Sequence, residues 1–264
     1  MKNLVIIILI LFTSCINSDN KKYYKLGLYH FNNKDYLNAL VFFKKVDSVY
    51  EHCNRNAFLG ASYQNLGNYK NAIIHFESAK TNCDPNVELL INLSDSYYKD
   101  EKFDSAVSVG LLAYKKDPNL FQSCFNLGLF YYDLEEYDYA YHYLKKAELL
   151  NSEDNDVYDL LATVYSAAGE YDSSLIYINK AIKIDKRLEY FVERSTYYAM
   201  LKDFDSCIND LNYVISIDSM NEAAYYNRSH ALYKIGKTEE ACKDFTVAKK
   251  INPNSDLEKW VKCY

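Results

Sequence analysis

Histidine and cysteine are the side chains of this chain best suited to chemistry, because they bind metals and act as bases or nucleophiles. The five histidines are scattered, at His30, His52, His75, His142 and His230. The sequence contains no His-Glu-x-x-His and no pair of Cys-x-x-Cys motifs, the spacings that bring zinc ligands together. Glu51, His52 and Cys53 with Cys83 could in principle hold a metal, but an ordinary loop is the favoured interpretation. We predict no metal site.

The acidic and glycine-rich motifs of known catalysts are also missing. The run 151–156 resembles a calcium loop only faintly, because it lacks the central glycine and the closing glutamate. Glu135–Glu136 are neighbours along the chain and do not form an acid–base pair across a cleft. No phosphate-binding glycine loop and no serine in a nucleophile elbow occur. We therefore predict no catalytic residue, no cofactor and no enzymatic activity.

The first fifteen residues have the pattern of an export signal. Lys2 is followed by an unbroken apolar run from Leu4 to Phe12, and Thr13 and Ser14 are small. This run is shorter than the roughly 20 residues needed to span a bilayer. A charged end, a short apolar run and small residues are typical of a secretory signal peptide.

The segment Leu11-Phe12-Thr13-Ser14-Cys15 also resembles the lipobox of bacterial lipoproteins. In that family the peptide is cleaved before the cysteine, whose thiol carries diacylglycerol. The resemblance implies a signal peptide over 1–14, lipidation of Cys15, a short tether over 15–19 and a location on a membrane of a bacterial envelope, with the outer membrane favoured. A plain secretory signal with an incidental cysteine and an uncleaved anchor are the alternatives.

The rest of the chain is a repeat array. A small residue recurs every 33 or 34 positions, at Gly27, Gly60, Ser94, Gly128, Ala162, Ser195 and Ser229. A second small residue follows twelve positions later, at Ala39, Ala72, Ala106, Ala140, Ser174, Cys207 and Ala241. A fixed period of this length indicates stacked supersecondary units rather than one globular core.

Glycine and proline mark the boundaries within each repeat. Glycines fall at the expected helix crossing (Gly27, Gly60, Gly128) and at the expected hairpin turn (Gly67, Gly169, Gly236). All three prolines lie at repeat boundaries, where they end a helix: Pro85, Pro118 and Pro253.

The residues at fixed offsets resemble the tetratricopeptide repeat, a helix-turn-helix of 34 residues. The second repeat shows the match at Leu59, Gly60, Tyr63, Gly67, Tyr69, Ala72, Phe76 and Ala79. The resemblance implies an all-α solenoid of about seven repeats, with approximate bounds 20–52, 53–86, 87–120, 121–154, 155–187, 188–221 and 222–253. A capping helix over 254–264, which contains Trp260, completes the expected fold.

Two cysteines fall at the ends of one expected hairpin. Cys53 opens the first helix of repeat 2 and Cys83 closes the second, and these ends of an antiparallel pair lie side by side. An exported protein can oxidise them, so we predict a Cys53–Cys83 disulfide. Cys124 and Cys207 fall at buried registers, where cysteine acts as a small apolar side chain.

In tetratricopeptide repeats the first helix of each repeat lines a concave surface, with the second, fifth, ninth, twelfth and thirteenth positions facing inward. Carried onto this chain, the resemblance implies a partner-binding groove formed by Tyr24, Phe31, Asp95, Tyr98, Phe125, Tyr132, Asp133, Asp159, Tyr226, His230 and Tyr233. Aromatic and acidic side chains on one face suit an extended or helical peptide with apolar anchors and some Lys or Arg. Tyrosine is abundant throughout, with 28 residues, so many of these rings could equally be structural.

These observations predict a non-catalytic adaptor, anchored by lipid in a bacterial envelope, that binds partner proteins or peptides. A net charge of −6 without a basic block argues against nucleic-acid binding. The alternative is capture of a glycan or small nutrient on stacked groove tyrosines.

Overall fold

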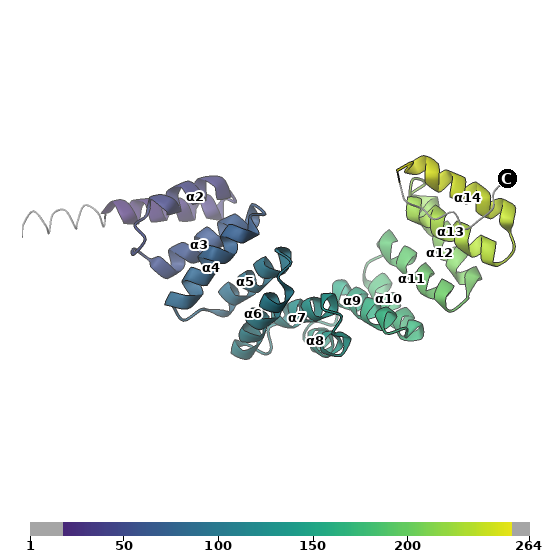
Figure 1. The fold of residues 1–264 in the computed structure, drawn as a ribbon, viewed down its shortest axis with the longest axis horizontal. Helices are drawn as coiled ribbons and strands as arrows, with labels where there is room; N and C mark the ends of the chain where they lie inside the picture. Colours follow the sequence, from purple (N-terminus) through teal and green to yellow (C-terminus); the bar gives the residue numbers. More distant parts are fainter. Residues whose placement is uncertain (1–17, 255–264) are drawn as a thin grey trace, which may run out of the picture. The chain divides into compact units, whose positions relative to one another are not determined.

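The computed structural model describes residues 18–254, and in this range every regular element is a helix. Fourteen helices form seven consecutive hairpins, which confirms the all-α repeat architecture (Figure 1). The predicted signal peptide, Cys15 and nearly all of the predicted capping helix lie outside the described residues.

The hairpins follow the expected repeat bounds closely. The first pairs a helix over residues 18–32 with α2 (Tyr36–Lys45). Five further hairpins are α3 (His52–Asn65) with α4 (Tyr69–Asn82), α5 (Val87–Lys99) with α6 (Phe103–Lys116), α9 (Asn155–Ala167) with α10 (Tyr171–Ile184), α11 (Leu188–Met200) with α12 (Phe204–Ile217), and α13 (Glu222–Lys234) with α14 (Thr238–Ile251). The helices of the fourth repeat are α7 (Phe121–Asp133) and α8 (Tyr137–Leu150).

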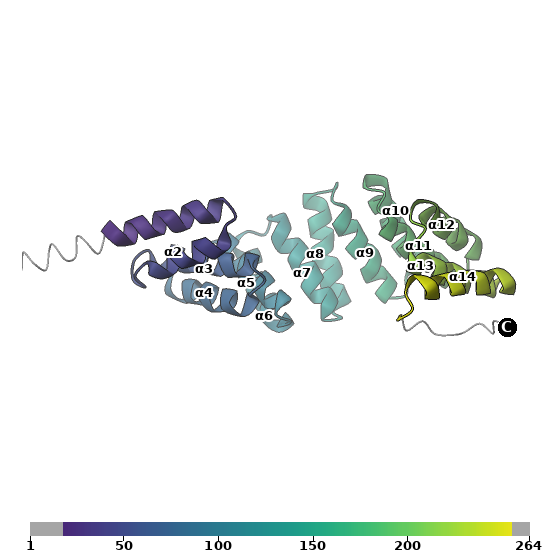
Figure 2. The same cartoon turned by 90° about the horizontal axis from the view of Figure 1, so that it is seen from above.

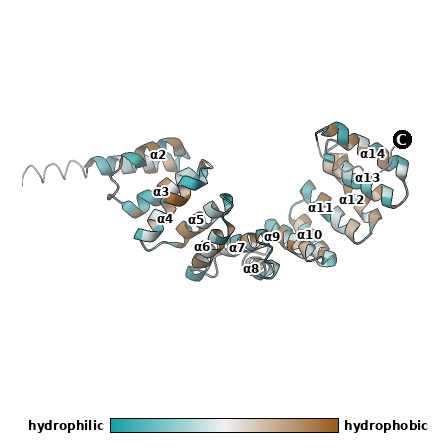
Figure 3. Cartoon of the chain, in the orientation of Figure 1, coloured by the Kyte–Doolittle hydropathy of each residue, from teal (hydrophilic) through white to brown (hydrophobic). Residues whose placement is uncertain are grey.

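The helices belong to two compact units, divided between Leu134 and Glu135. Unit 1 ends with α7 and unit 2 begins just before α8. Within each unit, helices that follow one another in the chain pack side by side, as two views of the ribbon show (Figures 1 and 2). Polar and apolar residues alternate along each helix (Figure 3), as expected for helices that bury one side against their neighbours.

Each hairpin turns at the fifteenth position of its repeat with a left-handed backbone. Three of these turns use the predicted glycines, with φ between 72° and 82° at Gly67, Gly169 and Gly236. The other four place a lysine or glutamate there, with φ between 59° and 64° at Lys34, Glu101, Glu135 and Lys202. The left-handed turn is thus a property of the fold, and glycine only makes it easier to adopt.

Small residues at the helix crossing let an aromatic ring fill the hairpin. A Cβ added to Gly60 would lie 2.6 Å from the ring of Phe76, and one added to Gly27 would lie 2.6 Å from Phe43. Phe43 and Phe76 are almost completely buried. Any larger residue at either glycine would displace a ring that forms the core of its hairpin.

Cysteine chemistry differs between the buried and the hairpin-end positions. Cys53 and Cys83 form a disulfide with Cα atoms 6.1 Å apart, which joins the start of α3 to the end of α4. Cys124 and Cys207 are buried, as their registers predict. Among the described residues, no helix is both long enough and apolar enough to cross a membrane.

Candidate functional site

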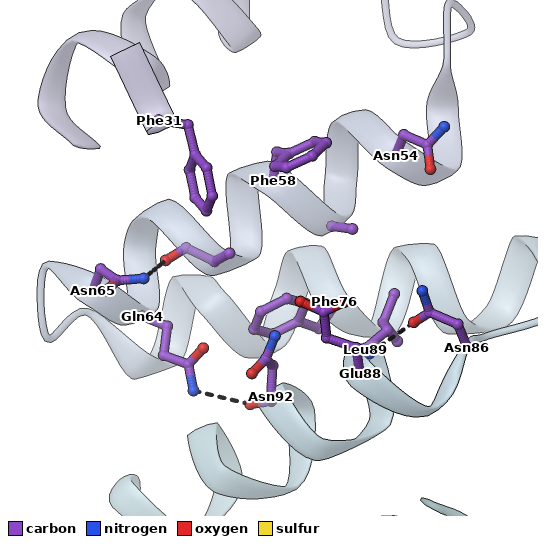
Figure 4. A pocket seen from close by; sticks show the side chains of 12 residues that line it. Phe31, Asn54, Phe58, Gln64, Asn65, Phe76, Asn86, Glu88, Leu89 and Asn92 are labelled. Atoms are coloured by element: carbon purple, nitrogen blue, oxygen red, sulfur yellow. Dashed lines mark hydrogen bonds between the residues drawn. The ribbon is translucent and has the colours of Figure 1, made fainter. Parts of the chain in front are cut away.

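A hollow of about 330 Å³ lies along the first helices of the early repeats in unit 1 (Figure 4). Its walls come from the helix over residues 18–32, from α3 and from α5, and its floor includes the buried ring of Phe76 from α4. The residues that line it are Phe31, Asn54, Ala57, Phe58, Ala61, Gln64, Asn65, Phe76, Asn86, Glu88, Leu89 and Asn92.

The hollow coincides with the positions that the repeat register places on the ligand-binding surface. In repeat 2, the second, fifth, ninth, twelfth and thirteenth positions are Asn54, Ala57, Ala61, Gln64 and Asn65. All five line the hollow. The two alanines leave room at its centre, and the amides surround that room.

Hydrogen bonds fix the orientation of several of these amides. Gln64 donates from Nε2 to the carboxylate of Asp95 (2.8 Å) and to the carbonyl of Asn92 (3.2 Å), which links α3 to α5. Asn65 donates to the carbonyl of Ala61 (2.8 Å). A carboxamide has two donor hydrogens and an acceptor oxygen, so each retains capacity for a further partner. The wall can therefore pair with the N–H and C=O groups of an extended chain.

Aromatic rings supply the apolar part of the site. Phe31 and Phe58 meet edge to face with centroids 5.1 Å apart, and Phe58 stacks on the buried ring of Phe43 at 5.5 Å. Figure 4 shows Phe31 and Phe58 beside one another, with Gln64 of α3 and Asn92 of α5 below them. This pair offers an apolar surface next to a polar wall, the combination that anchors a side chain while its backbone is hydrogen-bonded.

The predicted tyrosines of unit 1 are engaged within the protein. Tyr24 packs edge-on against Phe43 and Phe58. Tyr98 on α5 donates a hydrogen bond to Asp133 on α7 (2.6 Å), and its ring stacks on Phe130 at 5.0 Å. Burial raises the pKa of Tyr24 to about 12 and, with the hydrogen bond to Asp133, also raises the pKa of Tyr98. Both phenols therefore stay neutral, and the second acts as an inter-repeat link.

The remaining predicted residues of unit 1 lie on α7. Phe125 is half-buried and stacks on Phe121 with centroids 6.0 Å apart. Tyr132 is half-buried and Asp133 is exposed. None of these lines the hollow, whereas Phe31 does and Asp95 holds one of its amides.

In unit 2 the predicted Asp159 faces a second acid. Its pKa is raised by burial, then by a hydrogen bond with Glu193 and by the charge of that residue. Glu193 on α11 also accepts hydrogen bonds from Thr163 on α9 (3.1 Å) and from Tyr197. Two carboxylates this close to each other favour a shared proton over two negative charges. The pair joins the first helices of repeats 5 and 6.

The other predicted residues of unit 2 lie on α13. Tyr226 and His230 are half-buried, and Tyr233 is exposed. His230 lines a smaller hollow of about 240 Å³ with Ser195, Thr196, Met200 and Asn227. Burial, and to a smaller extent the charge of Lys234, lowers the pKa of His230, so its imidazole is neutral at pH 7.

The structure thus distributes the predicted groove residues over two units and gathers few of them at the hollow of unit 1. The amides that dominate this hollow are absent from the predicted groove residues, most of which are aromatic or acidic. The repeat register could have identified these amides, because Asn54, Gln64 and Asn65 occupy three of the five inward-facing positions of repeat 2. Among residues 18–254, no group of three or more His, Cys, Asp or Glu side chains is placed to hold a metal ion.

Comparison with known proteins gives the family. The tetratricopeptide repeat profile matches residues 56–81, 121–154, 156–187 and 222–255. The chain is a tetratricopeptide repeat (TPR) protein.

A TPR repeat-containing protein of Methanocaldococcus jannaschii is 28% identical over 198 residues, which cover 74% of this chain and 32% of that protein. A small glutamine-rich TPR-containing protein of Mycosarcoma maydis is 26% identical over 117 residues, covering 44% of this chain and 31% of that one. This TPR chain spans about a third of the length of either relative.

Solved structures share the TPR fold. A TPR protein from Parabacteroides merdae superposes with a TM-score of 0.69 at 19% identity, covering 91% of this chain and 96% of that one. YrrB, described as a TPR protein with an unusual peptide-binding site, gives a TM-score of 0.59 at 20% identity and covers 69% of this chain and 94% of its own.

Proposed function

We propose that this TPR protein is a non-catalytic scaffold that binds an extended segment of a partner protein in the hollow of unit 1. The observation that carries the proposal is the lining of that hollow: all five inward positions of repeat 2 contribute to it, and three of them carry amides. The family's use of this surface and the peptide-binding site described for YrrB support the same interpretation.

The lining indicates the chemistry of the bound segment. Asn54, Asn65 and Asn92 can pair with its backbone, while Phe31 and Phe58 receive one apolar side chain. The exposed carboxylate of Glu88 lies at the same hollow, and no lysine or arginine lines it. A segment with an apolar anchor and a nearby Lys or Arg would match both features.

We further propose that Cys15 carries the lipid anchor, so that the scaffold holds its partners at a membrane of a bacterial envelope. The support is the sequence from Leu4 to Cys15, with its short apolar run and lipobox-like end. Intact-mass analysis of the membrane-extracted protein tests this directly. The expected mass corresponds to cleavage before Cys15 plus acyl groups, and a Cys15→Ala variant should lack them. An unmodified Cys15 would refute the anchor.

Glycan or nutrient capture, the alternative, required tyrosines that present flat open faces. In unit 1 the ring of Tyr98 stacks on Phe130, and Tyr24 packs against two phenylalanines. These rings are therefore already covered on a face or edge, which favours a peptide over a sugar.

Site-specific photocrosslinking in cells tests the scaffold. A photoreactive phenylalanine analogue at Ala61 lies in the hollow, and the same analogue at Ile74, 62% exposed on α4, is the control. We expect defined partner segments to crosslink from Ala61 and not from Ile74. Identical products from both positions, or none from Ala61, would contradict the proposal.

Affinity measurements then test the amides. A synthetic peptide of the crosslinked segment should bind the Asn54→Ala and Asn92→Ala variants about 2- to 10-fold more weakly per lost hydrogen bond. Asn71→Ala, at a half-buried asparagine on α4 that does not line the hollow, is the matched control. Circular dichroism of each variant verifies that the fold is retained.

A further inference from the structure

The first helix of the array exposes a surface that is buried in every later repeat. The third, sixth and tenth positions of a repeat face the preceding hairpin: Arg55 donates to the carbonyl of Phe43 (3.0 Å), and Phe58 stacks on the ring of Phe43. The tenth position is buried in repeats 2 to 7, at Ser62, Ser96, Phe130, Val164, Tyr197 and Ala231. In repeat 1 the same position is Tyr29, which is 64% exposed.

This open end is basic. The third and sixth positions of repeat 1 are Lys22 and Lys25, both exposed, and Lys21 beside them is exposed as well. The helix over 18–32 contains Asp19 as its one acidic residue, at its N-terminal end. The helix therefore carries a net positive charge in a chain whose net charge is −6. We call the surface formed by Lys21, Lys22, Lys25 and Tyr29 the basic end face.

The composition of the basic end face exceeds what solubility requires. A terminal repeat needs a polar outer surface, which charges of either sign would provide in an otherwise acidic chain. Here all three charges of the face are positive, and Lys25 and Lys22 lie about one and two helical turns before the exposed ring of Tyr29. Lysines around a tyrosine are typical of surfaces that lie in the headgroup region of an anionic membrane. Like charges also disfavour two copies stacking through this face.

The position of the face in the sequence points to the same partner. The described part of this helix starts at residue 18, three residues after Cys15. A lipid on Cys15 would hold this helix, and no other, within a few residues of the bilayer. The diacylglyceryl group proposed for Cys15 would keep the helix at the bilayer, and a basic surface close to it adds electrostatic attraction to anionic headgroups.

We propose that the basic end face binds the anionic headgroups of a phospholipid bilayer, so that the first repeat lies on the membrane and the array projects from it. The proposal builds on the anchor suggested for Cys15. It is nevertheless tested without that anchor, because lysines and headgroups attract each other whether or not the thiol is acylated.

The test uses the full chain with Cys15→Ser, which cannot be acylated, and measures binding to two kinds of vesicle. One is pure phosphatidylcholine and the other contains about one third phosphatidylglycerol. Lys22→Gln/Lys25→Gln should weaken binding to the anionic vesicles by roughly 20-fold, since each lysine near such a surface contributes about fivefold. Binding to phosphatidylcholine should not change, and salt at about 0.5 M should abolish the difference.

Two variants keep the result interpretable. Lys70→Gln/Lys115→Gln makes the same charge change at exposed lysines on α4 and α6, and it should bind as the parent chain does. Lys22→Arg/Lys25→Arg should retain binding, because the charge is kept. Residues 1–14 are common to all variants, so differences report on the end face alone. Equal binding of the Lys22→Gln/Lys25→Gln variant and the parent would overturn the proposal, whereas failure of the anchor appears separately, as an unmodified Cys15 in the mass measurement.

Discussion

The seventh position of the repeat is filled in two different ways, by leucine in unit 1 and in repeat 5 of unit 2 (Leu161), and by arginine in the last two repeats of unit 2. In repeats 2, 3 and 4 it is a leucine on a helix of unit 1, and Leu59, Leu93 and Leu127 are all fully buried. In repeats 6 and 7 of unit 2 it is Arg194 and Arg228. These guanidinium groups are also mostly buried, with 18% and 20% of the side chain exposed.

Both arginines are paired in the same manner. Arg194 on α11 forms a bidentate pair with Asp210 on α12 (2.8 and 2.6 Å) and donates to Asn179 on α10. Arg228 repeats this with Asp244 (2.7 and 2.8 Å) and Asn212. The aspartate belongs to the same hairpin and the asparagine to the preceding one. One side chain thus links three helices.

The difference shows what the fold requires at this position. The space at this position must be filled, and any polar group placed there must have hydrogen-bond partners. One leucine fills the space alone, whereas an arginine also needs partners in two hairpins. A leucine packs against any apolar neighbour, whereas the arginine needs an aspartate 16 residues later and an asparagine 15 or 16 residues earlier. The polar version therefore specifies which hairpins can be neighbours more strictly than the apolar one.

The largest expected effect comes from placing the arginine where its partners are missing. The offsets that give Arg194 its Asp210 and Asn179 lead from Leu59 to His75 and Lys44. Leu59→Arg should therefore bury an unpaired charge and cost more than about 4 kcal/mol of unfolding free energy. Urea unfolding followed by circular dichroism measures this, with Leu59→Met, at less than about 1.5 kcal/mol, as the control. If Leu59→Arg unfolds at the same urea concentration as the parent protein, an arginine at this position does not need the aspartate and asparagine partners.

Removing one partner in unit 2 should have an effect nearly as large. Asp210→Ala leaves the guanidinium of Arg194 buried without its counter-charge and should cost about 3–5 kcal/mol. The double replacement Arg194→Leu/Asp210→Leu, which recreates an apolar site like that of unit 1, should be within about 1 kcal/mol of the parent protein. Thermal unfolding of the three proteins side by side decides the matter. If the double variant is as unstable as Asp210→Ala, an apolar pair cannot replace the arginine–aspartate pair at this position.

The disulfide provides a moderate effect confined to unit 1. Cys53→Ser/Cys83→Ser removes a constraint across 30 residues and should cost about 2–4 kcal/mol. Hydrogen exchange resolved by peptide should show faster opening of α3 and α4 and unchanged protection of α9 to α12. Chemical reduction is a poorer test, because Cys242 in unit 2 is disulfide-bonded as well. Equal loss of protection in both units would mean that the disulfide acts beyond its own hairpin.

The smallest expected effect is a pH dependence confined to unit 2. Burial and Glu193 raise the pKa of Asp159 above its ordinary value. Between the ordinary and the raised pKa the folded state holds a proton that the unfolded state releases, so stability falls as the pH rises through that range. Asp159→Asn should flatten this dependence. As the pH rises, the Tm of the variant should fall by about 2–4 °C less than the Tm of the parent protein. Asp172→Asn, at an exposed carboxylate on α10, should not.

Much of the architecture followed from the spacing of small residues, glycines and prolines. The period located all seven hairpins. The left-handed turn lies at the same repeat position even where Lys34 or Glu101 replaces glycine. The site was less predictable. The register identified the correct face, but Asn54 and Gln64 resemble ordinary surface residues until Ala57 and Ala61 are seen to open a hollow between them.

The sequence by itself determined the repeat, its hairpins and the faces that each helix buries, because these depend on contacts within about 34 residues that recur seven times. Tertiary structure decided which inward residues remain available to a partner. Tyr98 is covered by Phe130, and Asp159 meets Glu193, because residues of neighbouring repeats approach one another only after stacking. That approach depends on the size and charge of side chains about 30 positions apart, which a periodic pattern does not encode.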